Sequence, residues 1–383
     1  MSLLSETNST VFSSAQLNTN TINAGVVITE GLAAQMAVLH DLTTTNLAST
    51  NLASTAIELS GKTVVLQSQI VAGGSQGDVV FSTDGINFVT VSAPNNPAPN
   101  PDALFKGSVN DVAADGEKWI AVANQALGVG PIMGISYNGY GWAAHPSPPG
   151  PLNTLTTVAY LNNLWLCGGQ DSSMFYSLDG FTWTACTGQS VGSYVKSFAY
   201  GQGKWVVVGS PGFSGVTQAY SLDGISWTPA QGLYFTGAGG FKVASSATLF
   251  VAYGNDNYGA SMMRVSTDGI TWGLANTPPP TSFGYSVAVN ASGTMWVSSG
   301  ELARLYYSTD GLNWINSNFT NVAAAQLIWD GVKFVAVGQV VAPTNKDTAI
   351  SYDGIHWSLI NVFMNERAAC ITINPKRGNL ALD

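Results

Sequence analysis

Ser177-Leu-Asp179-Gly-Phe-Thr-Trp183 is one of seven copies of a phrase made of Ser, any residue, Asp or Asn, Gly, two further residues and an aromatic ring. Successive copies start between 41 and 54 residues apart, which is the length of one four-stranded blade in a β-propeller. The recurrence therefore predicts an all-β fold, a seven-bladed β-propeller. The copies begin at Ser82, Ser136, Ser177, Ser221, Ser266, Ser308 and Ser351.

The phrase has the chemistry of a tight hairpin between two alternating strands. Gly accepts the positive φ that such a turn requires, and the preceding Asp can bond the amides of its own turn. We therefore interpret the acidic or amide residue of each copy as a structural turn residue and remove it from the candidate catalytic groups. These residues are Asp84, Asn138, Asp179, Asp223, Asp268, Asp310 and Asp353.

The two ends of the repeat region complement each other. Gly61–Gln67 resembles the second strand of a blade, so the first unit lacks a first strand of its own. Ala368–Asn374 resembles a first strand, and no unit follows it. We expect the C-terminal segment to complete the first blade, which would remove two open sheet edges. The predicted propeller therefore spans residues 61–383.

Residues 1–60 differ in composition from the rest. They contain no Lys or Arg and one aromatic residue, Phe12, and they carry two identical pentads at Asn46–Thr50 and Asn51–Thr55. So sparse an apolar stripe buries too little area to order one chain against its backbone entropy. We predict an oligomerising stalk or docking arm that contacts other structural proteins, with a disordered tail as the alternative. Within this segment, helical spacing of apolar residues predicts a short helix over Gly31–Leu42.

Composition excludes several function classes. Charged residues make up 9% of the chain and the formal net charge is −9, so the surface cannot neutralise a nucleic-acid backbone. No apolar run reaches the roughly 18 residues of a membrane span. The three Cys and three His residues lack disulfide or metal-ligand spacing, so we expect no cofactor and no metal. The first residues lack the pattern of a classical signal peptide, which favours a virion or extracellular surface reached by another route.

A binding site is expected on the rim opposite the Asp-Gly turns. There the loops between second and third strands meet the connections between blades, and several of these connections are rich in proline. Carboxylates and aromatic rings in those loops suit sugar recognition; the alternative is that they only solvate and pad the loops. The candidate ligand-binding residues are Asp171, Tyr194, Tyr234, Asp256, Tyr258, Glu301 and Asp347.

The repeated phrase resembles the Asp-box of bacterial-neuraminidase-type repeats, which lies between the third and fourth strands of propeller blades. It departs from that pattern because Gly follows Asp directly; in addition, Asn138 replaces one Asp and Phe88 one Trp. Members of that group include sialidases, which use three arginines to hold the substrate carboxylate. This chain has four arginines in all, none in the context typical of those enzymes, so sialidase activity is not favoured.

We interpret the sequence as a non-enzymatic surface or structural protein of a virion or phage, such as a fibre, spike or capsid-associated component. The N-terminal stalk resembles that of phage and virus appendage proteins, and the propeller head would bind a glycan or a protein during host attachment. One alternative is a secreted glycoside hydrolase acting from the loop-rich face. Another is a pure scaffold within a larger assembly.

Overall fold

The computed structural model describes residues 10–12, 27–29, 37–39, 47–49, 56–59, 62–91, 104–126, 128–189, 191–237, 239–255, 261–280, 284–300, 303–340, 347–360 and 368–382. The chain divides into two compact units, one formed by residues 1–68 with 376–383 and the other by residues 69–375.

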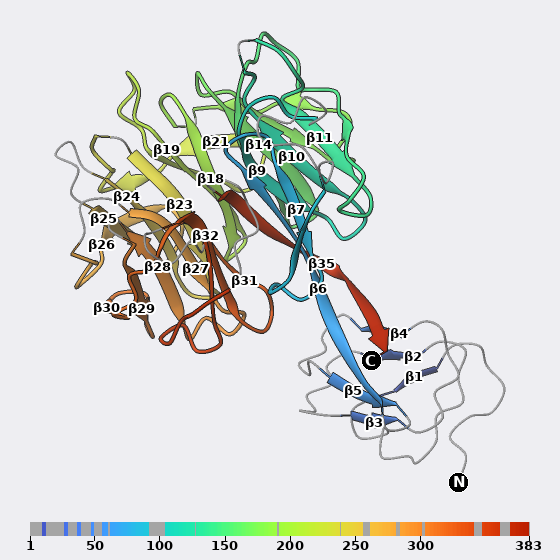
Figure 1. Ribbon diagram of the computed structural model, residues 1–383. Helices are drawn as coiled ribbons and strands as arrows, with labels where there is room; N and C mark the ends of the chain where they lie inside the picture. Colours follow the sequence, from blue (N-terminus) through green and yellow to red (C-terminus); the bar gives the residue numbers. More distant parts are fainter. Residues whose placement is uncertain are drawn as a thin grey trace. The chain divides into compact units, whose positions relative to one another are not determined.

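The larger unit is a seven-bladed β-propeller whose sheets surround a common centre (Figure 1). Blade 1 contains β6 (Lys62–Gly74), β7 (Val79–Ser82), β8 (Phe88–Thr90) and β35 (Ala368–Leu382). Blade 2 contains β9 (Val109–Ala114), β10 (Trp119–Ala123), β11 (Met133–Ser136) and β12 (Ala143–Ala144). Blade 3 contains β13 (Leu155–Leu161), β14 (Leu164–Gly169), β15 (Met174–Ser177) and β16 (Thr184–Ala185). Blade 4 contains β18 (Val195–Gly201), β19 (Lys204–Gly209), β20 (Gln218–Ser221) and β21 (Ser226–Pro229).

The remaining blades repeat this antiparallel order. Blade 5 contains β23 (Gly239–Ser245), β24 (Phe250–Asn255), β25 (Ser261–Ser266) and β26 (Thr271–Leu274). Blade 6 contains β27 (Gly284–Val289), β28 (Trp296–Gly300), β29 (Leu305–Ser308) and β30 (Ile315–Asn316). Blade 7 contains β31 (Val322–Trp329), β32 (Phe334–Val340), β33 (Thr348–Ser351) and β34 (Ser358–Leu359). Two short strands, β17 (Thr187–Gly188) and β22 (Gln231–Gly232), pair in parallel with β21 and β26 and cover the outer edges of blades 4 and 5.

The hydrophobic core consists of seven clusters, each packed between two neighbouring blades. The second strand supplies the largest buried side chains, such as Trp119, Trp165 and Trp296. The first strands of neighbouring blades contact one another, so they form the innermost layer of the ring. Each blade therefore stabilises the next, because every cluster of the described residues is shared by two blades.

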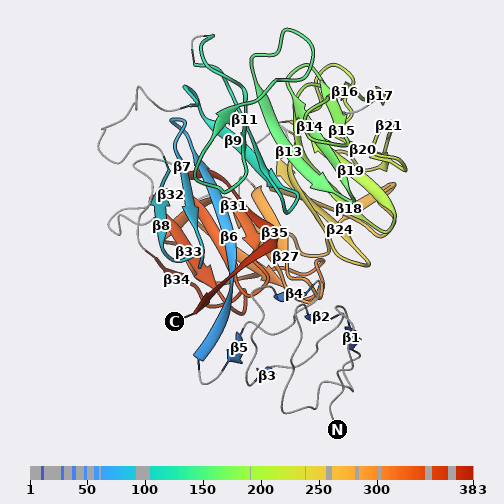
Figure 2. The same ribbon diagram turned by 90° about the vertical axis from the view of Figure 1, so that its right-hand side faces the viewer.

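The ring is closed between blade 7 and blade 1. The C-terminal β35 pairs with β6 and lies beside it in Figure 2. A single cluster joins Ile371 of β35 and Ile70 of β6 to Val335 of blade 7. The backbone N–H of Ile371 also donates to Oε1 of Gln326 at 3.1 Å. Chain ends about 300 residues apart in sequence thus complete one sheet.

The second strand of blade 1 begins at Ile70, which lies opposite Ser82, whereas the sequence match placed it at Gly61–Gln67. The early part of β6 pairs instead with β5, where Leu59 lies opposite Lys62. The strand β6 therefore pairs with β5 along its first part and with β7 along its last part, and all three strands belong to one sheet. The larger compact unit starts at residue 69.

The smaller unit contains parallel strands. β1 (Thr10–Phe12), β2 (Val27–Thr29) and β4 (Leu47–Ser49) form one sheet, and β3 (Ala37–Leu39) pairs in parallel with β5 (Ala56–Leu59). The predicted helix over Gly31–Leu42 is wrong at residues 37–39, where pairing with β5 holds an extended backbone. The rest of that predicted helix lies outside the described residues.

All seven repeated phrases adopt the same turn. The Ser hydroxyl accepts the Gly N–H at 2.9 Å in every copy, and each Gly has φ between 68° and 81°. Oδ1 of the Asp or Asn accepts the backbone amides of the second and third residues after it, as Asp179 does from Phe181 and Thr182. Asn138 makes the same pair of bonds, which explains why an amide can replace the carboxylate.

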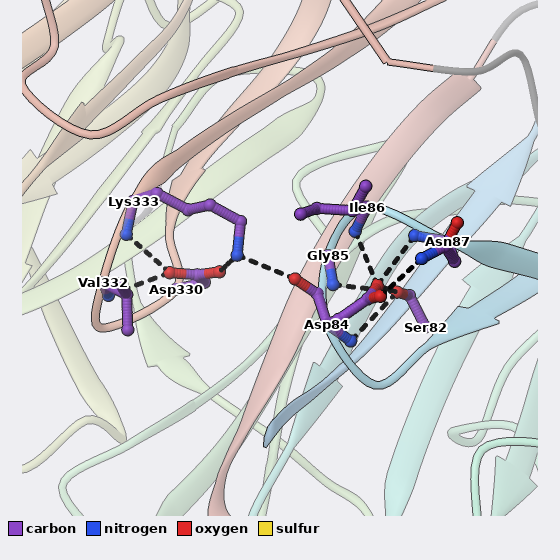
Figure 3. A network of polar contacts seen from close by, with 8 residues as sticks. All are labelled: Ser82, Asp84, Gly85, Ile86, Asn87, Asp330, Val332 and Lys333. Atoms are coloured by element: carbon purple, nitrogen blue, oxygen red, sulfur yellow. Dashed lines mark hydrogen bonds and ion pairs between the residues drawn. The ribbon is translucent and has the colours of Figure 1, made fainter. Parts of the chain in front are cut away.

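A buried ion pair at the end of blade 7 contacts the first of these turns (Figure 3). Nζ of Lys333 lies 2.7 Å from Oδ2 of Asp330 and donates to the backbone carbonyl of Asp84 in blade 1 at 2.8 Å. Oδ1 of Asp330 accepts the backbone amides of Val332 and Lys333. This network is a second, polar link across the closure of the ring.

Candidate functional site

The candidate site is a cavity of about 540 Å³ at the centre of the propeller. All seven innermost strands contribute one matching residue to its lining. We call this set the bulge ring, and it consists of Asn110, Thr156, Lys196, Phe241, Tyr285, Ala325 and Ala369. Residues of the loops between second and third strands, such as Ser75 and Gln170, also line the cavity. The cavity therefore opens on the rim opposite the Asp-Gly turns, which we call the loop rim.

In six of the seven strands, the residue of the bulge ring lies at a β-bulge. In blade 4, Val195 lies opposite Gly209 and Ser197 opposite Val208, so Lys196 has no partner across the ladder. The same one-residue skip occurs in the first strands of blades 2, 3, 5, 6 and 7. Bulges redirect a side chain out of the regular alternation, and here they direct it away from the core into the cavity. In six of the seven strands, Lys196 among them, the half-buried ring residue lies between two buried neighbours.

The residue after the bulge ties its blade to the next one. Oδ2 of Asp111 accepts the backbone N–H of Val158 at 3.2 Å, and Oγ of Ser286 accepts that of Leu327 at 3.0 Å. Ser197 and Gln326 make equivalent bonds to the neighbouring first strands. These cross-blade bonds fix the inner strands on both sides of the ring residues. The cavity wall is thus preorganised by backbone contacts.

The electrostatics of the cavity are set by two lysines and one carboxylate. Lys196 and Lys242, on neighbouring blades, both line the cavity. The described residues form three ion pairs, and neither lysine takes part in them. The Lys196 ammonium lies 4.9 Å from the ring centroid of Tyr194, and burial lowers the pKa of Lys196. The carboxylate is Asp111, which the hydrogen bonds described above already engage.

The binding residues predicted from the sequence differ in how far the structure exposes them. Asp171 is exposed in the turn between β14 and β15, with φ of 54°. Tyr194 is 37% exposed on the loop rim, and its hydroxyl accepts a bond from Nε2 of Gln170, a cavity residue. Tyr234 is half-buried, and its hydroxyl donates to the carbonyl of Ala230 within its own loop.

Asp347 is fully buried at the start of β33, so it presents no carboxylate to the loop rim, in contrast to the expectation from its place in a loop. Its Oδ1 accepts the hydroxyl of Thr348, and its carbonyl accepts the N–H of Gly338. Asp256, Tyr258 and Glu301 lie outside the described residues. Tyr194 is therefore the one described candidate that contacts a residue of the cavity.

The bulge ring was missed because the sequence reasoning followed acidic and aromatic loop residues. A signal was nevertheless present in the repeat. Aligned first strands read Val-Asn-Asp-Val at 109–112, Val-Lys-Ser-Phe at 195–198 and Gly-Tyr-Ser-Val at 284–287. The second position varies between amide, hydroxyl, ammonium, aromatic ring and methyl, while the fourth stays apolar. A chemically variable position inside a regular repeat indicates a side chain that the fold does not use.

Other chemistry has less support in the described parts of the chain. There, no three His, Cys, Asp or Glu side chains are grouped as metal ligands would be. The same parts contain no helix with the length and apolar character that a membrane crossing requires. A second cavity of about 570 Å³ lies at the other ends of the inner strands, lined by residues such as Gln202, Asn290 and Trp329.

Comparisons with known proteins identify the fold. No protein-family model matches the sequence, and none of the curated proteins matches it. A solved structure described as "YCF48 bound to D1 peptide" has a TM-score of 0.51 and 13% identity, covering 78% of this chain and 88% of the other. One described as "Crystal Structure of Mitotic Checkpoint Complex" has a TM-score of 0.50 and 10% identity, covering 68% and 79%. At such low identity these similarities support the propeller and leave the ligand open.

Proposed function

We propose that this chain is a non-enzymatic binding protein whose propeller takes a glycan or a protein segment at the central cavity of the loop rim. The observation that carries the proposal is the bulge ring: seven strands direct one side chain each into a single cavity. Bulges interrupt sheet pairing, so a ring of them is more consistent with a binding role than with packing alone.

The chemistry of the cavity supports binding of a mixed polar and apolar ligand. Asn110, Thr156 and Lys196 line the side formed by blades 2 to 4, while Phe241 and Tyr285 line blades 5 and 6. A few convergent polar groups beside aromatic surface are typical of ligand sites. The peptide bound by YCF48 in one of the similar propeller structures makes a protein segment a reasonable ligand class for this fold.

The proposal for the biological setting rests on the amino-acid sequence. We propose a surface or structural role in a virion or phage, with residues 1–60 contacting other structural proteins and joining copies of the chain. The low charge and the Thr- and Asn-rich pentads support this setting. Mass measurement of the intact protein, compared with that of a chain lacking residues 1–60, tests the oligomerisation.

The test of the binding site is to fill the cavity without changing its charge. Ala325 lines the cavity and is half-buried, so the larger side chain of Ala325→Trp should fill part of the cavity. Leu178→Trp is the matched control, because Leu178 is 79% exposed on the Asp-Gly rim. Glycan arrays and peptide arrays should give ligands that bind the original protein and Leu178→Trp equally and Ala325→Trp at least tenfold more weakly.

Two outcomes would contradict the proposal. Binding that Ala325→Trp leaves unchanged would place the site elsewhere, and arrays without any ligand would favour the pure scaffold. Hydrolysis of aryl glycosides that is lost on Asp171→Asn would instead establish the glycoside hydrolase. Asp171 is chosen because, of the predicted carboxylates that the structure describes, it is the exposed one.

A further inference from the structure

The two lysines of the cavity form no ion pair with any of the described residues. Lys196 and Lys242 come from first strands of adjacent blades and line the same space. The whole chain has 13 Lys and Arg residues and a net charge of −9, whereas the lining of this cavity holds two lysines and one aspartate and so has a local excess of positive charge. Partly buried ammonium groups without a carboxylate are costly unless they bind an anion.

The one carboxylate in the lining, Asp111, forms no ion pair with either lysine. Asp111 is 6% exposed, and its Oδ2 accepts the hydroxyl of Thr157 at 2.8 Å and the amide of Val158 at 3.2 Å. Its Oδ1 accepts the amide of Val112 at 3.1 Å. These bonds join blades 2 and 3, so the Asp111 carboxylate serves the closure between blades.

The cavity also offers an apolar surface. Phe241 and Tyr285 are half-buried in its wall and leave ring surface for an apolar group.

We propose that the central cavity binds the C-terminal end of a peptide, with the terminal carboxylate held by Lys196 and Lys242. The last side chain of the peptide contacts Phe241 and Tyr285. A carboxylate and an apolar group occur together at every C-terminus with an apolar last residue. The volume of about 540 Å³ lies within the usual range of ligand pockets. This inference rests on the proposed binding function and specifies the ligand of that site.

The experiment compares two arrays of the same random hexapeptides, one ending in free carboxylates and the other in carboxamides. Hits are then measured in solution by fluorescence polarisation of peptides labelled at the N-terminus. We expect binding to the free carboxylates alone, and a Kd weakened about tenfold or more by Lys196→Met or Lys242→Met, since each removes a charge-assisted bond.

Lys106→Met is the matched control, because Lys106 is exposed near the loop rim and does not line the cavity. It should leave the Kd within about twofold of the original. Lys196→Gln and a urea unfolding curve for each variant separate lost binding from lost folding. Raising the salt concentration should weaken binding of free-carboxylate peptides.

The outcomes separate the two proposals. Peptides that bind equally with a carboxamide end, or whose Kd is unchanged by Lys196→Met and Lys242→Met, overturn the carboxylate site while Ala325→Trp still tests the cavity. Binding only to glucuronate-bearing oligosaccharides, lost on Lys196→Met, overturns the peptide as ligand. An absence of any peptide or glycan ligand overturns both.

Discussion

Removing the ammonium of Lys333 tests how the ring is closed. Lys333→Met keeps most of the apolar stem but deletes the 2.7 Å contact with Asp330 and the 2.8 Å bond to the carbonyl of Asp84. The two side chains of the ion pair are 8% and 1% exposed. A buried carboxylate that loses its cation costs about 3 to 5 kcal/mol. Because the Met stem retains packing, we expect a loss of about 3 kcal/mol in the free energy of unfolding at pH 7.

The assay is urea unfolding followed by Trp fluorescence, with Asp330→Asn and the double variant completing a double-mutant cycle. Asn at 330 keeps the acceptor for the amides of Val332 and Lys333 without the charge. The double variant should therefore be more stable than Lys333→Met alone. A Lys333→Met protein within about 0.5 kcal/mol of the original, or a double variant whose loss equals the sum of the single losses, would refute this account.

Three further predictions concern the turns and the closing strand. Backbone amides of the turn, first that of Thr182, lower the pKa of Asp179 from its unfolded value near 3.8 to about 2. The ionised carboxylate therefore contributes its full stabilisation above about pH 4, and this stabilisation is lost as the pH falls toward 2. Asp179→Asn, which copies Asn138, should thus show a smaller fall in urea midpoint between pH 5 and pH 2.5, and an unchanged fall would contradict it. Gly224→Ala should destabilise the protein by about 3 kcal/mol and Gly203→Ala by about 1 to 2 kcal/mol. Both glycines have φ of 74°, but only at Gly224 would the new Cβ lie 2.3 Å from Cδ2 of Leu164. Equal losses in thermal unfolding would show that the contact is relieved. Ile371→Ala should cost about 2 to 4 kcal/mol and speed proteolysis of the C-terminal strand, since Ile371 is 1% exposed; unchanged proteolysis would argue against a closing role.

The amino-acid sequence by itself determined the repeat, the turn and the number of blades. The phrase is a local device whose hydrogen bonds join residues two or three positions apart, as in Asp179 with Phe181 and Thr182. Such contacts depend on residue type and spacing alone, so seven copies at blade length predict seven hairpins and the all-β fold. The alternating strands beside each turn carry the same local information.

The tertiary structure alone decided which side chains face the cavity. A bulge exists only relative to a partner strand, and one skipped residue reverses the face on which the following side chains lie. Lys196 thus points to the cavity because Val195 and Ser197 pair with successive residues of β19. Asp347 is fully buried although its place in a loop predicted an exposed carboxylate. The first part of β6 pairs with β5 and the last part with β7. These placements depend on the register in which each strand pairs with its neighbour, which no local spacing in the sequence specifies.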